Sequence, residues 1–569
     1  MRTIGRTRCW RYLPSVLIAV LFFPISSLAE KADVRLLLQI SVDGLRADRI
    51  ALGLPEFGDA GFRRLLENGA VFSNAHYQHA NTETIVGHTT LATGAHPSVH
   101  GMTGNVWYDA ADDELSYNIE DPEYLPLPTR ELARTGEQVD PAQLLARTTG
   151  RSPRAILAET LADKMSSATG GRAKVFAVSN KDRSAVAMGG QKGKAFWMST
   201  DTGDYGTTEY YYYKYPDWVS AWNGERQAEH LASTTWSLLG APATYSRLHE
   251  DDRPYETDLR GFGRVFPHRY GEVDNKLLYA QVLSSPPGDA LLADFATSLI
   301  ENESLGQDDI VDYLSVSFSG VDAVNHFFGA SSLESEDMLR QLDKTLGEFF
   351  DYLDKEIGLE KVVLVLSADH GNAEAPEYLQ SKGLPAGRLY PEQIIDAANK
   401  LGSQLFDIED IVKFYYRPYL YLRADLIEAA GLDLAEVSDA ISDKLVDEPG
   451  IHAASTKNNN RLLADKELAE RIRNNYHPER AGDIYIVQDL YWFNFDRGPV
   501  AVMHGSPWSY DTHIPVIFMG PGVRSGETDR QIQPIDIAPT LAALLGLPPL
   551  ASAQGELLTE VFEPQTSPE

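Results

Sequence analysis

Short runs of consecutive apolar residues recur along the chain and give it its basic pattern. They cover 34–42, 173–178, 312–318, 362–366 and 516–518. Apolar runs that do not alternate with polar residues are typical of parallel strands buried on both faces. Val71 and Phe72 predict a further, shorter strand. The runs therefore predict the strands of one buried sheet.

Between these runs lie segments whose apolar residues are spaced as on one face of a helix. They predict helices over 62–68, 155–165, 335–353, 434–444, 465–474 and 536–545. Gly69 follows the first of these as a predicted C-cap. Strands that alternate with helices predict an α/β fold, here a central, mostly parallel sheet sandwiched by helices.

Two stretches interrupt this alternation. Residues from about 200 to 275 begin with a segment rich in Tyr and Trp, and we expect surface insertions near the functional face. Residues 373–495 mix short strands with helices and predict an inserted α+β subdomain. The core is then expected to comprise 30–372 and 496–569.

Residues 1–29 have the pattern of a secretory signal peptide. Four arginines and no acidic residue precede an apolar stretch over 13–25, which Pro14 and Pro24 interrupt. This stretch is a poor membrane span, and a small-x-small site stands before Glu30. We expect a periplasmic or secreted protein without stable membrane association after cleavage. An uncleaved N-terminal anchor is the alternative, because the two kinds of segment look alike.

Composition adds two constraints. The only cysteine, Cys9, lies in the predicted signal peptide, so the mature chain is expected to have no disulfide. The formal net charge of −32 argues against binding to a nucleic-acid backbone and otherwise favours solubility. The 43% apolar and 23% charged residues are ordinary for a globular protein.

Candidate ligand side chains follow the predicted strand ends. In parallel α/β sheets, ligands bind at the carboxyl ends of the strands. A set of three aspartates and three histidines suits zinc, and it exceeds the four ligands that one ion needs. The set is Asp43, Asp322, His326, Asp369, His370 and His504. Asp322 and His326 are four residues apart, so one helical turn would place them on one face.

Taken singly, each signal also has an ordinary structural explanation. Asp43 before Gly44 is typical of a turn, and Asp322 could cap a helix. Thr84 begins a helix-like segment, where it could be an N-cap or could lie at a helix N-terminus that favours an anion. Lone histidines are most often hydrogen-bonded structural groups, and Lys181 with Arg183 could form a solvated charged turn.

A series of motifs in one order resembles the alkaline phosphatase superfamily. The motifs are Ser41–Gly44, Thr82–Thr84 with Gly87–His88, Gly104–Asn105, Asp322 with His326, Ala368–Gly371, and His504–Pro507 with Tyr510–His513. The pattern is most similar to the large single-chain bacterial alkaline phosphatases of the phosphate-insensitive type, which use threonine. Nucleotide pyrophosphatases/phosphodiesterases share a related core. The resemblance covers essentially the whole mature chain.

The resemblance implies two zinc ions per chain and a threonine nucleophile. One ion would be held by Asp322, His326 and His504. The other would be held by Asp43, Asp369, His370 and the hydroxyl of Thr84. Asn105, Lys181 and Arg183 would bind the phosphate oxygens. Lys181 is also expected to take the electrostatic role of the magnesium site found in the enterobacterial members.

The leading hypothesis is therefore a periplasmic alkaline phosphatase, expected to be a monomer. It would hydrolyse small phosphate monoesters through a phosphothreonine intermediate at Thr84. Lys181 and Arg183 favour monoesters, because a dianionic terminal phosphate offers more charge to bind than a diester does. A phosphodiesterase or nucleotide pyrophosphatase on the same two-zinc core is the alternative. A metal- or phosphate-binding protein without turnover is a minor one.

Overall fold

The computed structural model describes residues 33–109, 112–128, 140–259, 261–495 and 500–562. The predicted signal peptide, 1–29, lies outside the described residues. Within the described ranges, no helix has both the length and the apolar character needed to cross a membrane.

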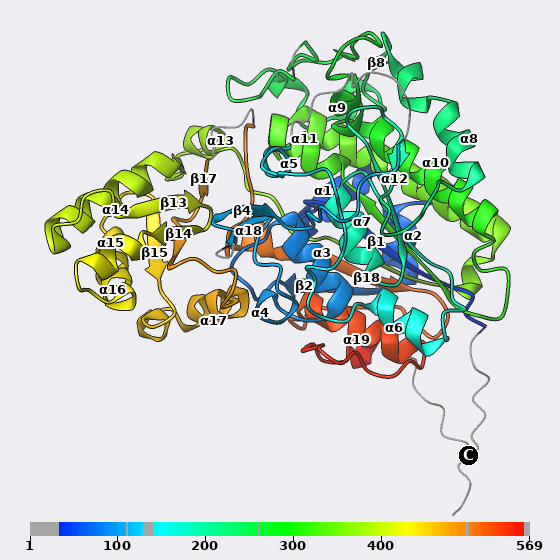
Figure 1. The fold of residues 1–569 in the computed structure, drawn as a ribbon. Helices are drawn as coiled ribbons and strands as arrows, with labels where there is room; N and C mark the ends of the chain where they lie inside the picture. Colours follow the sequence, from blue (N-terminus) through cyan, green and yellow to red (C-terminus); the bar gives the residue numbers. More distant parts are fainter. Residues whose placement is uncertain (1–32, 110–111, 129–139, 260, 496–499, 563–569) are drawn as a thin grey trace, which may run out of the picture.

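A nine-stranded sheet forms the centre of the molecule, with the order β19-β2-β18-β11-β1-β10-β5-β6-β7 (Figure 1). Strand β1 (Leu36–Val42) lies between β10 (Asp312–Phe318) and β11 (Val362–Ser367), and all three are parallel. Next to β10 lies β5 (Val175–Ser179), also parallel. These strands are buried along their whole length, as the continuous apolar runs predict.

The outer strands include the antiparallel pairs of the sheet. Strand β18 (His513–Met519) runs antiparallel to both β11 and β2 (Ala70–His76). At the two ends are β19 (Gly526–Thr528), and β6 (Lys194–Met198) with β7 (Tyr205–Gly206). The prediction of a mostly parallel central sheet flanked by helices is confirmed.

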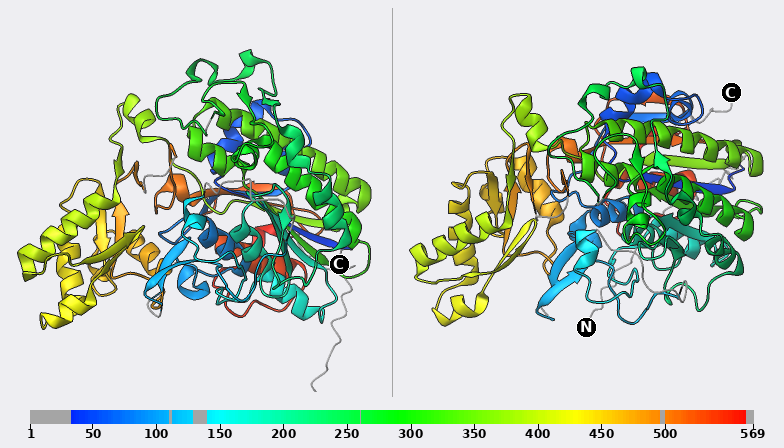
Figure 2. Two further views of the ribbon diagram at one scale, coloured as in Figure 1. Left: turned by 45° about the horizontal axis from the view of Figure 1, so that its top comes forward. Right: turned by 90° about the horizontal axis from the view of Figure 1, so that it is seen from above.

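Helices cover both faces of the sheet (Figures 1 and 2). On one face α10 (Pro286–Glu303) and α11 (Gly320–Phe328) pack against α12 (Leu333–Glu356), which also contacts α2 (Phe62–Asn68). On the other face α3 (Thr84–Thr93) packs against α6 (Leu161–Ala168), α7 (Asp182–Gly189) and α19 (Ile537–Leu544).

The helix predicted over 155–165 is present, but its start was predicted too early, because α6 begins only at Leu161. A capping box sets this start: the Thr160 hydroxyl accepts from the Asp163 N–H, and the Asp163 carboxylate accepts from the Thr160 N–H. Gly69 follows the end of helix α2, as predicted, but in an extended conformation. Helix α12 is longer than the predicted 335–353, because Ser332 caps its start.

The aromatic stretch after residue 200 is only partly a surface insertion, which corrects the prediction. Tyr205 lies in β7, is fully buried and stacks on Phe295 with the ring centroids 4.1 Å apart. Tyr213, by contrast, is fully exposed. The elements that follow are α8 (Asp217–Gly224), β8 (Thr235–Trp236), β9 (His268–Arg269) and α9 (Leu278–Leu283).

A separate four-stranded sheet lies within the range 373–495, beside the main body (Figure 2). Its strands, in sheet order, are β13 (Val412–Tyr416), β14 (Tyr419–Leu422), β16 (Ile484–Gln488) and β15 (Ile451–Ser455). The helices α14 (Pro391–Phe406) and α16 (Leu434–Leu445) share an apolar cluster with it. This part of the chain thus has a hydrophobic core distinct from that of the main sheet.

The remaining elements are short or peripheral. Near the main sheet they are α1 (Ala47–Gly53), α4 (Pro97–His100), β3 (Val106–Asp109), β4 (Glu114–Tyr117), α5 (Pro141–Leu144) and α18 (Ser509–Thr512). Beside the smaller sheet they are α13 (Pro376–Ser381), β12 (Gly387–Leu389), α15 (Ala424–Ala429), α17 (Lys466–Asn475) and β17 (Trp492–Asn494).

Candidate active site

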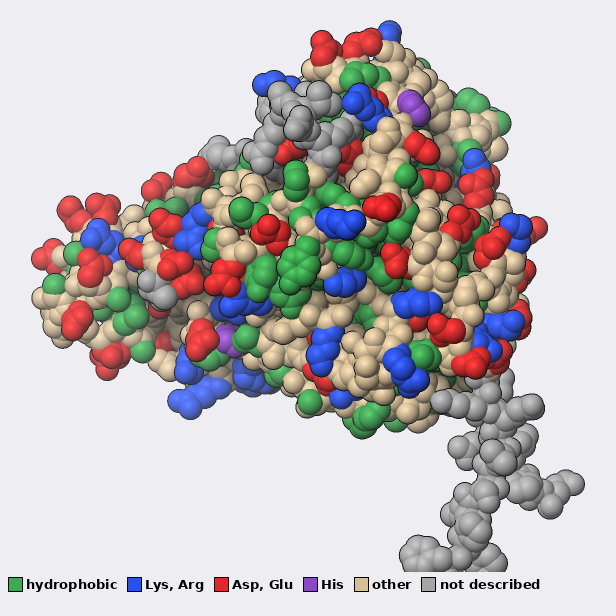
Figure 3. Space-filling view, turned by 45° about the vertical axis from the view of Figure 1, so that its right-hand side comes forward, with side chains coloured by type: hydrophobic (Ala, Val, Ile, Leu, Met, Phe, Trp, Pro, Cys, Tyr) green, Lys and Arg blue, Asp and Glu red, His purple; other side chains and the backbone are tan. Residues whose placement is uncertain are grey.

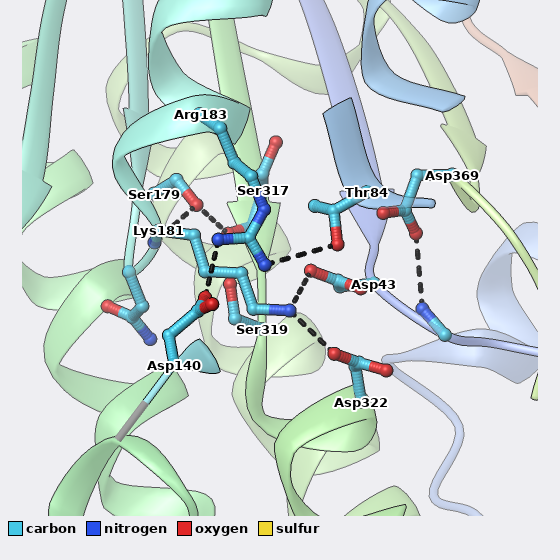
Figure 4. A network of polar contacts seen from close by, with 12 residues as sticks. Asp43, Thr84, Asp140, Ser179, Lys181, Arg183, Ser317, Ser319, Asp322 and Asp369 are labelled. Carbon is cyan, nitrogen blue, oxygen red and sulfur yellow. Dashed lines mark hydrogen bonds and ion pairs between the residues drawn. The ribbon is translucent and has the colours of Figure 1, made fainter. Parts of the chain in front are cut away.

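The carboxyl ends of four adjacent parallel strands meet at one edge of the main sheet. Asp43 directly follows β1, and Asp369 and His370 follow β11. Strand β5 leads to Lys181, and β10 leads into α11, which carries Asp322. The structure therefore brings residues from distant parts of the chain into one network of polar contacts (Figure 4).

The turn after β1 brings Asp43 close to α11. Gly44 has φ +71, and a Cβ built on it would lie 2.9 Å from the Cβ of Asp322. Only glycine combines the left-handed conformation with this close approach. Asp43 is thus part of a tight turn and is also directed into the polar network, so the two explanations for this residue are compatible.

The first cluster of possible ligands joins Asp322, His326 and His504. The His326 Nε2 lies 3.2 Å from the Asp322 Oδ2, as expected for residues four apart on α11. The His504 Nε2 lies 3.7 Å from the Asp322 Oδ1. The donor atoms of these three residues are all within 4.8 Å of one another. Asp322 is not the N-cap of α11, since Ser319 occupies that position.

The second cluster joins Asp43, Asp369 and His370. The His370 Nε2 lies 3.3 Å from both the Asp43 Oδ1 and the Asp369 Oδ2. Adjacent residues can both reach this point because the chain after β11 is irregular. Asp322 also belongs here geometrically, since its carboxylate lies within 4.8 Å of the donor atoms of Asp43 and His370. The two clusters therefore share Asp322 as a possible ligand.

All three imidazoles are held in the same way. The Nδ1 atoms of His326, His370 and His504 lie 2.7–2.8 Å from the backbone carbonyls of Val502, Gly371 and Thr82, respectively. A carbonyl only accepts, so each Nδ1 carries a hydrogen and donates. Each Nε2 is thereby directed to the carboxylates, which is the usual orientation of a histidine that binds a metal.

Lys181 connects the two clusters. Its ammonium lies 2.6 Å from both the Asp43 Oδ2 and the Asp322 Oδ2, and its side chain is 15% exposed. Lys181 is extended at the N-cap of α7, whereas Arg183 is already in the first turn of that helix. Although the two residues differ in backbone conformation, both side chains reach the same site (Figure 4).

Thr84 is the first residue of α3 and is completely buried. Glu83 occupies the N-cap position, so the Thr84 side chain is not used for capping. Its hydroxyl accepts from the Arg183 Nη2 at 3.4 Å. Gly87 lets α3 pack closely against the backbone of Asp369, because a Cβ at this position would lie 1.9 Å from the Asp369 carbonyl oxygen. The hydroxyl thus faces the cationic side of the site from a helix N-terminus.

Arg183 and Asn105 are each held by an acidic residue that the sequence did not single out. The Arg183 guanidinium donates to Asp140, whose carboxylate also accepts from the N–H groups of Ala142 and Gln143. The Asn105 N–H donates to Glu83 at 2.6 Å, and its Oδ1 accepts from the Ile85 N–H at 3.2 Å. Among these, Glu83 could have been noticed as a neighbour of Thr84, whereas Asp140 has no such signal.

Arg417 and His88 complete the surroundings of the site. Arg417 lies between β13 and β14 of the smaller sheet, and it donates to the His504 carbonyl at 3.2 Å. It also lies 3.5 Å from the Glu83 carboxylate. The His88 Nδ1 is 3.1 Å from the Asp369 Oδ2. The smaller sheet therefore contributes directly to the site, which sequence patterns did not indicate.

The ionisable groups of the network shift one another strongly. Burial raises the pKa of Asp43, and the charge of Asp369 adds to the effect. Burial also opposes ionisation of Asp322, but His326 and Lys181 outweigh it and hold its pKa well below the usual range. For His370, burial disfavours the cation, yet Asp369 and Asp43 raise its pKa to about 10. Three buried aspartates thus compete for few positive charges.

A cavity of about 1000 Å³ opens onto these residues. Its polar side includes Asn105, Lys181, Arg183, Asp322, His326 and His504. The lining also includes the apolar residues Leu125, Leu127, Trp197, Met198, Val500 and Met503. Elsewhere, acidic side chains are spread over the face shown in Figure 3, with hydrophobic ones gathered at its centre. A small anion with an organic substituent would fit a cavity of this composition.

The donor set fits metal ions. Asp43 Oδ1, Asp369 Oδ2 and His370 Nε2 are buried and make no hydrogen bond. Three aspartates face one lysine at the centre of the network, so the carboxylate charge exceeds the charge of the ammonium. Mixed carboxylate and imidazole ligands are typical of zinc. The arrangement can therefore hold one or more cations.

Comparison with known proteins agrees with this picture. A model of the type I phosphodiesterase / nucleotide pyrophosphatase family matches residues 37–507. Alkaline phosphatase PhoV of Synechococcus elongatus is 32% identical over 538 residues, which are 94% of this chain and 94% of that protein. Alkaline phosphatase PafA of Elizabethkingia meningoseptica is 31% identical over 534 residues, or 93% and 94%. The expected resemblance to the alkaline phosphatase superfamily is confirmed.

Solved structures give the same result. The crystal structure of wild-type PafA matches with a TM-score of 0.84 at 29% identity, covering 93% of this chain and 99% of that one. Another PafA structure carries substitutions of a threonine, an asparagine, a lysine and an arginine. The first two are 21 positions apart and the last two are two apart, as Thr84 and Asn105, and Lys181 and Arg183, are here. Murine ectonucleotide pyrophosphatase / phosphodiesterase 5, at 14% identity and a TM-score of 0.52, shares the fold.

Proposed function

The chain belongs to the type I phosphodiesterase / nucleotide pyrophosphatase family, and we propose that within this family it is a phosphoric monoester hydrolase, an alkaline phosphatase. Relatives that align over nearly its whole length are alkaline phosphatases. The observation that carries the proposal is that Arg183 donates to the Thr84 hydroxyl while Lys181 binds Asp43 and Asp322 in the same polar network. Two cationic side chains in the site of the nucleophile suit the charge of a terminal phosphate.

The site residues would have the following roles. Two Zn²⁺ would be held by Asp322, His326 and His504, and by Asp43, Asp369, His370 and Thr84. Bound zinc would lower the pKa of the Thr84 hydroxyl and neutralise the leaving alkoxide. Two observations support this assignment. The Asp43 Oδ1 and Asp369 Oδ2 atoms are buried and make no hydrogen bond. The Nδ1 atoms of the three histidines are held by backbone carbonyls, which leaves each Nε2 for a metal. His370 must give up its proton to bind a metal, so metal binding should release a proton.

Thr84 is the proposed nucleophile. Its hydroxyl would give up its proton to water and its Oγ would attack phosphorus, forming a phosphothreonine. The ester P–O bond would break, and its electron pair would leave with the alcohol oxygen, which takes up a proton from water. The position of Thr84 at the start of α3 favours this, since helix N-terminal N–H groups stabilise the added negative charge. Water would then hydrolyse the phosphothreonine and release phosphate.

Arg183 and Lys181 are the proposed phosphate clamp, with Asn105. A phosphoryl transition state is stabilised mainly by positioning and by positive charge around its oxygens. A guanidinium can bind two phosphate oxygens at once, and an ammonium adds a point charge. Arg183 is preorganised for this, because Asp140 holds its Nη1 while its Nη2 faces Thr84.

A phosphodiesterase is the second candidate function. The matched family model, with its description as phosphodiesterase / nucleotide pyrophosphatase, favours it. The apolar residues of the cavity lining could accept the second ester group of such a substrate. Against it stand Lys181 and Arg183, whose charge would be excessive for a diester monoanion.

We propose that the mature protein begins at Glu30, is periplasmic or secreted, acts on small phosphate esters and is a monomer. We also propose that 373–495 is an inserted subdomain in a core formed by 30–372 and 496–569. That subdomain contributes Arg417 to the site, where Arg417 donates to the His504 carbonyl and lines the cavity.

Trapping of the covalent intermediate tests the proposal. The zinc-loaded mature protein is mixed with a labelled phosphate monoester and quenched in acid, and the label is located by mass spectrometry. We expect phosphate on Thr84, none in Thr84→Ala, and a loss of turnover in that variant of at least ~10³-fold. Thr84→Ser keeps the hydroxyl and should retain much of the activity. Full turnover by Thr84→Ala would overturn the mechanism.

A further inference from the structure

The turn between β13 and β14 brings one cation from the smaller sheet to a buried carboxylate of the candidate active site. The Nη2 of Arg417 lies 3.5 Å from the Oε1 of Glu83, and the two side chains are 11% and 0% exposed. The Nη1 of Arg417 donates to the His504 carbonyl at 3.2 Å. Solvent screens a buried ion pair little, so both charges act on their neighbours.

Glu83 directly precedes the proposed nucleophile, Thr84, and occupies the N-cap position of α3. Its Oε2 accepts from the Asn105 N–H at 2.6 Å and from the Asn81 side-chain amide at 3.3 Å. Both of these donors are neutral. Within the described residues, Arg417 is the only cationic side chain in an ion pair with Glu83. The charge of this carboxylate is therefore balanced by a residue of the smaller sheet.

The charge of Glu83 matters because of what lies beside it. Glu83 is hydrogen-bonded to the backbone of Asn105, which is a proposed phosphate ligand, and it is the chain neighbour of Thr84. A phosphate held between Thr84 and Asn105 would lie close to the carboxylate. Two anions in a poorly solvated site repel each other strongly. Phosphate binding therefore requires that the charge of Glu83 be compensated.

The strand that follows Arg417 is fastened to the main body by a buried asparagine of α17. The Asn475 amide donates to the Tyr419 hydroxyl of β14 at 3.3 Å and to the Thr103 carbonyl at 3.2 Å. Its side-chain oxygen accepts from the Asn81 N–H at 3.2 Å. These hydrogen bonds join α17 and β14 to the segments on both sides of α3. Tyr419 is only two residues beyond Arg417, so the guanidinium is held at the site.

We propose that Arg417 is a positioning residue for phosphate binding, which neutralises Glu83 so that a phosphate dianion can approach Thr84 and Asn105. The inference rests on the proposed function, because it concerns the same site. Arg417 acts through Glu83 and not by contact with the substrate. Removal of the cation alone should therefore weaken phosphate binding more than removal of both charges does.

Glu83→Gln removes the negative charge with little change of shape. Oε2 accepts both hydrogen bonds, and the side-chain oxygen of a glutamine can accept the same two. Oε1 is buried and makes no hydrogen bond, so an amide group in its place breaks none. That amide group would face the guanidinium of Arg417, so glutamine fits best where Arg417 is also replaced.

A double-mutant cycle tests the proposal. The zinc-loaded mature wild type, Arg417→Ala, Glu83→Gln and the double variant would be titrated with inorganic phosphate, followed by phosphorus NMR, and assayed with p-nitrophenyl phosphate. In Arg417→Ala we expect the Kd for phosphate and the KM to rise by at least ~10-fold, as for a buried charge that has lost its partner. In the double variant we expect both to return to within ~3-fold of the wild-type values.

Two further variants make the result specific. Arg417→Lys keeps the positive charge and should keep most of the phosphate affinity. Arg423→Ala, at an exposed ion pair with Asp425 just beyond β14, is the matched control and should bind phosphate like the wild type. If Arg417→Ala fails to fold, Arg417→Gln takes its place, since it removes the charge and keeps a polar side chain.

The inference and the proposed function fail in different ways. Wild-type phosphate affinity in Arg417→Ala would overturn the inference, as would a wild type that binds no phosphate. A double variant that binds no better than Arg417→Ala would overturn it too, and would place Arg417 in direct contact with the phosphate. A wild type that binds phosphate but hydrolyses no monoester would contradict the proposed function, while the phosphate titrations would still decide the role of Arg417.

Discussion

Arg183 can bind a phosphate only if its own charge is held in place. The side chain is buried, and the guanidinium has Asp140 on one side and the Thr84 hydroxyl on the other. Burial opposes ionisation of Asp140, but the charges of Arg183 and Lys181 outweigh it and keep its pKa below the ordinary value. Asp140 thus remains an anion that fixes the direction of the guanidinium.

Asp140→Asn should weaken this positioning without removing Arg183. We expect kcat/KM for a monoester to fall by ~10-fold, and inhibition by inorganic phosphate to weaken in parallel, as for a lost charged hydrogen bond of about 1.5–3 kcal/mol. Steady-state kinetics and phosphate inhibition would measure both. Asp112→Asn, at an exposed ion pair with Arg147, is the matched control. Unchanged phosphate affinity in Asp140→Asn would show that Arg183 needs no such partner.

At the residue scale, sequence motifs predicted the candidate ligands, but the partners that hold them came from the structure. Asp43, Asp322 and His370 stand in short motifs beside strand ends, where spacing is informative. Asp140 acts across 43 positions of sequence, and no local pattern encodes that contact. Arg417 reaches the site from a different sheet, so its role depends on how two units pack.

At the scale of elements, α11 is held at its start by another helix. Asp289, in the first turn of α10, accepts from the N–H groups of Ser319 and Gly320 at 3.2 and 3.0 Å. Ser319 is the N-cap of α11, which carries Asp322 and His326. Asp289 is completely buried, and burial raises its pKa to about 7. The carboxyl group is thus protonated at a pH where an exposed aspartate is ionised.

This shift predicts a pH dependence of stability. Between about pH 4 and pH 7 the folded state keeps a proton on Asp289 that the unfolded state has lost. Stability from this group is therefore complete below about pH 4 and declines as the pH rises to 7, by roughly 4 kcal/mol in all. Asp289→Asn should remove this decline, so its Tm relative to wild type should be higher at pH 8 than at pH 5. A difference in Tm that does not vary with pH would contradict the assignment.

Element prediction succeeded where burial decides and failed where capping or packing decides. The apolar runs located β1, β10 and β11 closely, because buried parallel strands must be apolar on both faces. The start of α6 was missed, because Thr160 and Asp163 form a capping box inside an otherwise helical pattern. The burial of Tyr205, inside a stretch predicted as a surface insertion, was missed because it depends on Phe295 from a helix distant in sequence.

At the scale of the whole molecule, the active site lies at the carboxyl edge of one sheet, and a second sheet contributes to it. The three aspartates Asp43, Asp322 and Asp369 are brought together against their mutual repulsion. Folding brings these charges together, and cations held by the site would compensate them. Metal content should therefore affect the stability of the whole fold as well as the reaction.

Removal of the metal should lower both stability and activity. When free zinc exceeds the dissociation constant ~1000-fold, binding contributes about 4 kcal/mol to the free energy of unfolding. We expect chelator-treated protein to melt at a lower temperature and to lose turnover, and zinc to restore both. Calorimetry with metal analysis of the same samples would measure this. Unchanged Tm and activity in metal-free protein would exclude a resident metal.

The comparison of monoester and diester hydrolysis tests the central claim most directly. Purified, zinc-loaded residues 30–569 would be assayed with p-nitrophenyl phosphate and bis-p-nitrophenyl phosphate at alkaline pH, alongside Lys181→Ala/Arg183→Ala. We predict a strong monoester preference in the wild type that collapses in the double variant, because the clamp acts on the charge of the terminal phosphate. A diester preference that survives the double substitution would contradict the assignment and make the protein a phosphodiesterase.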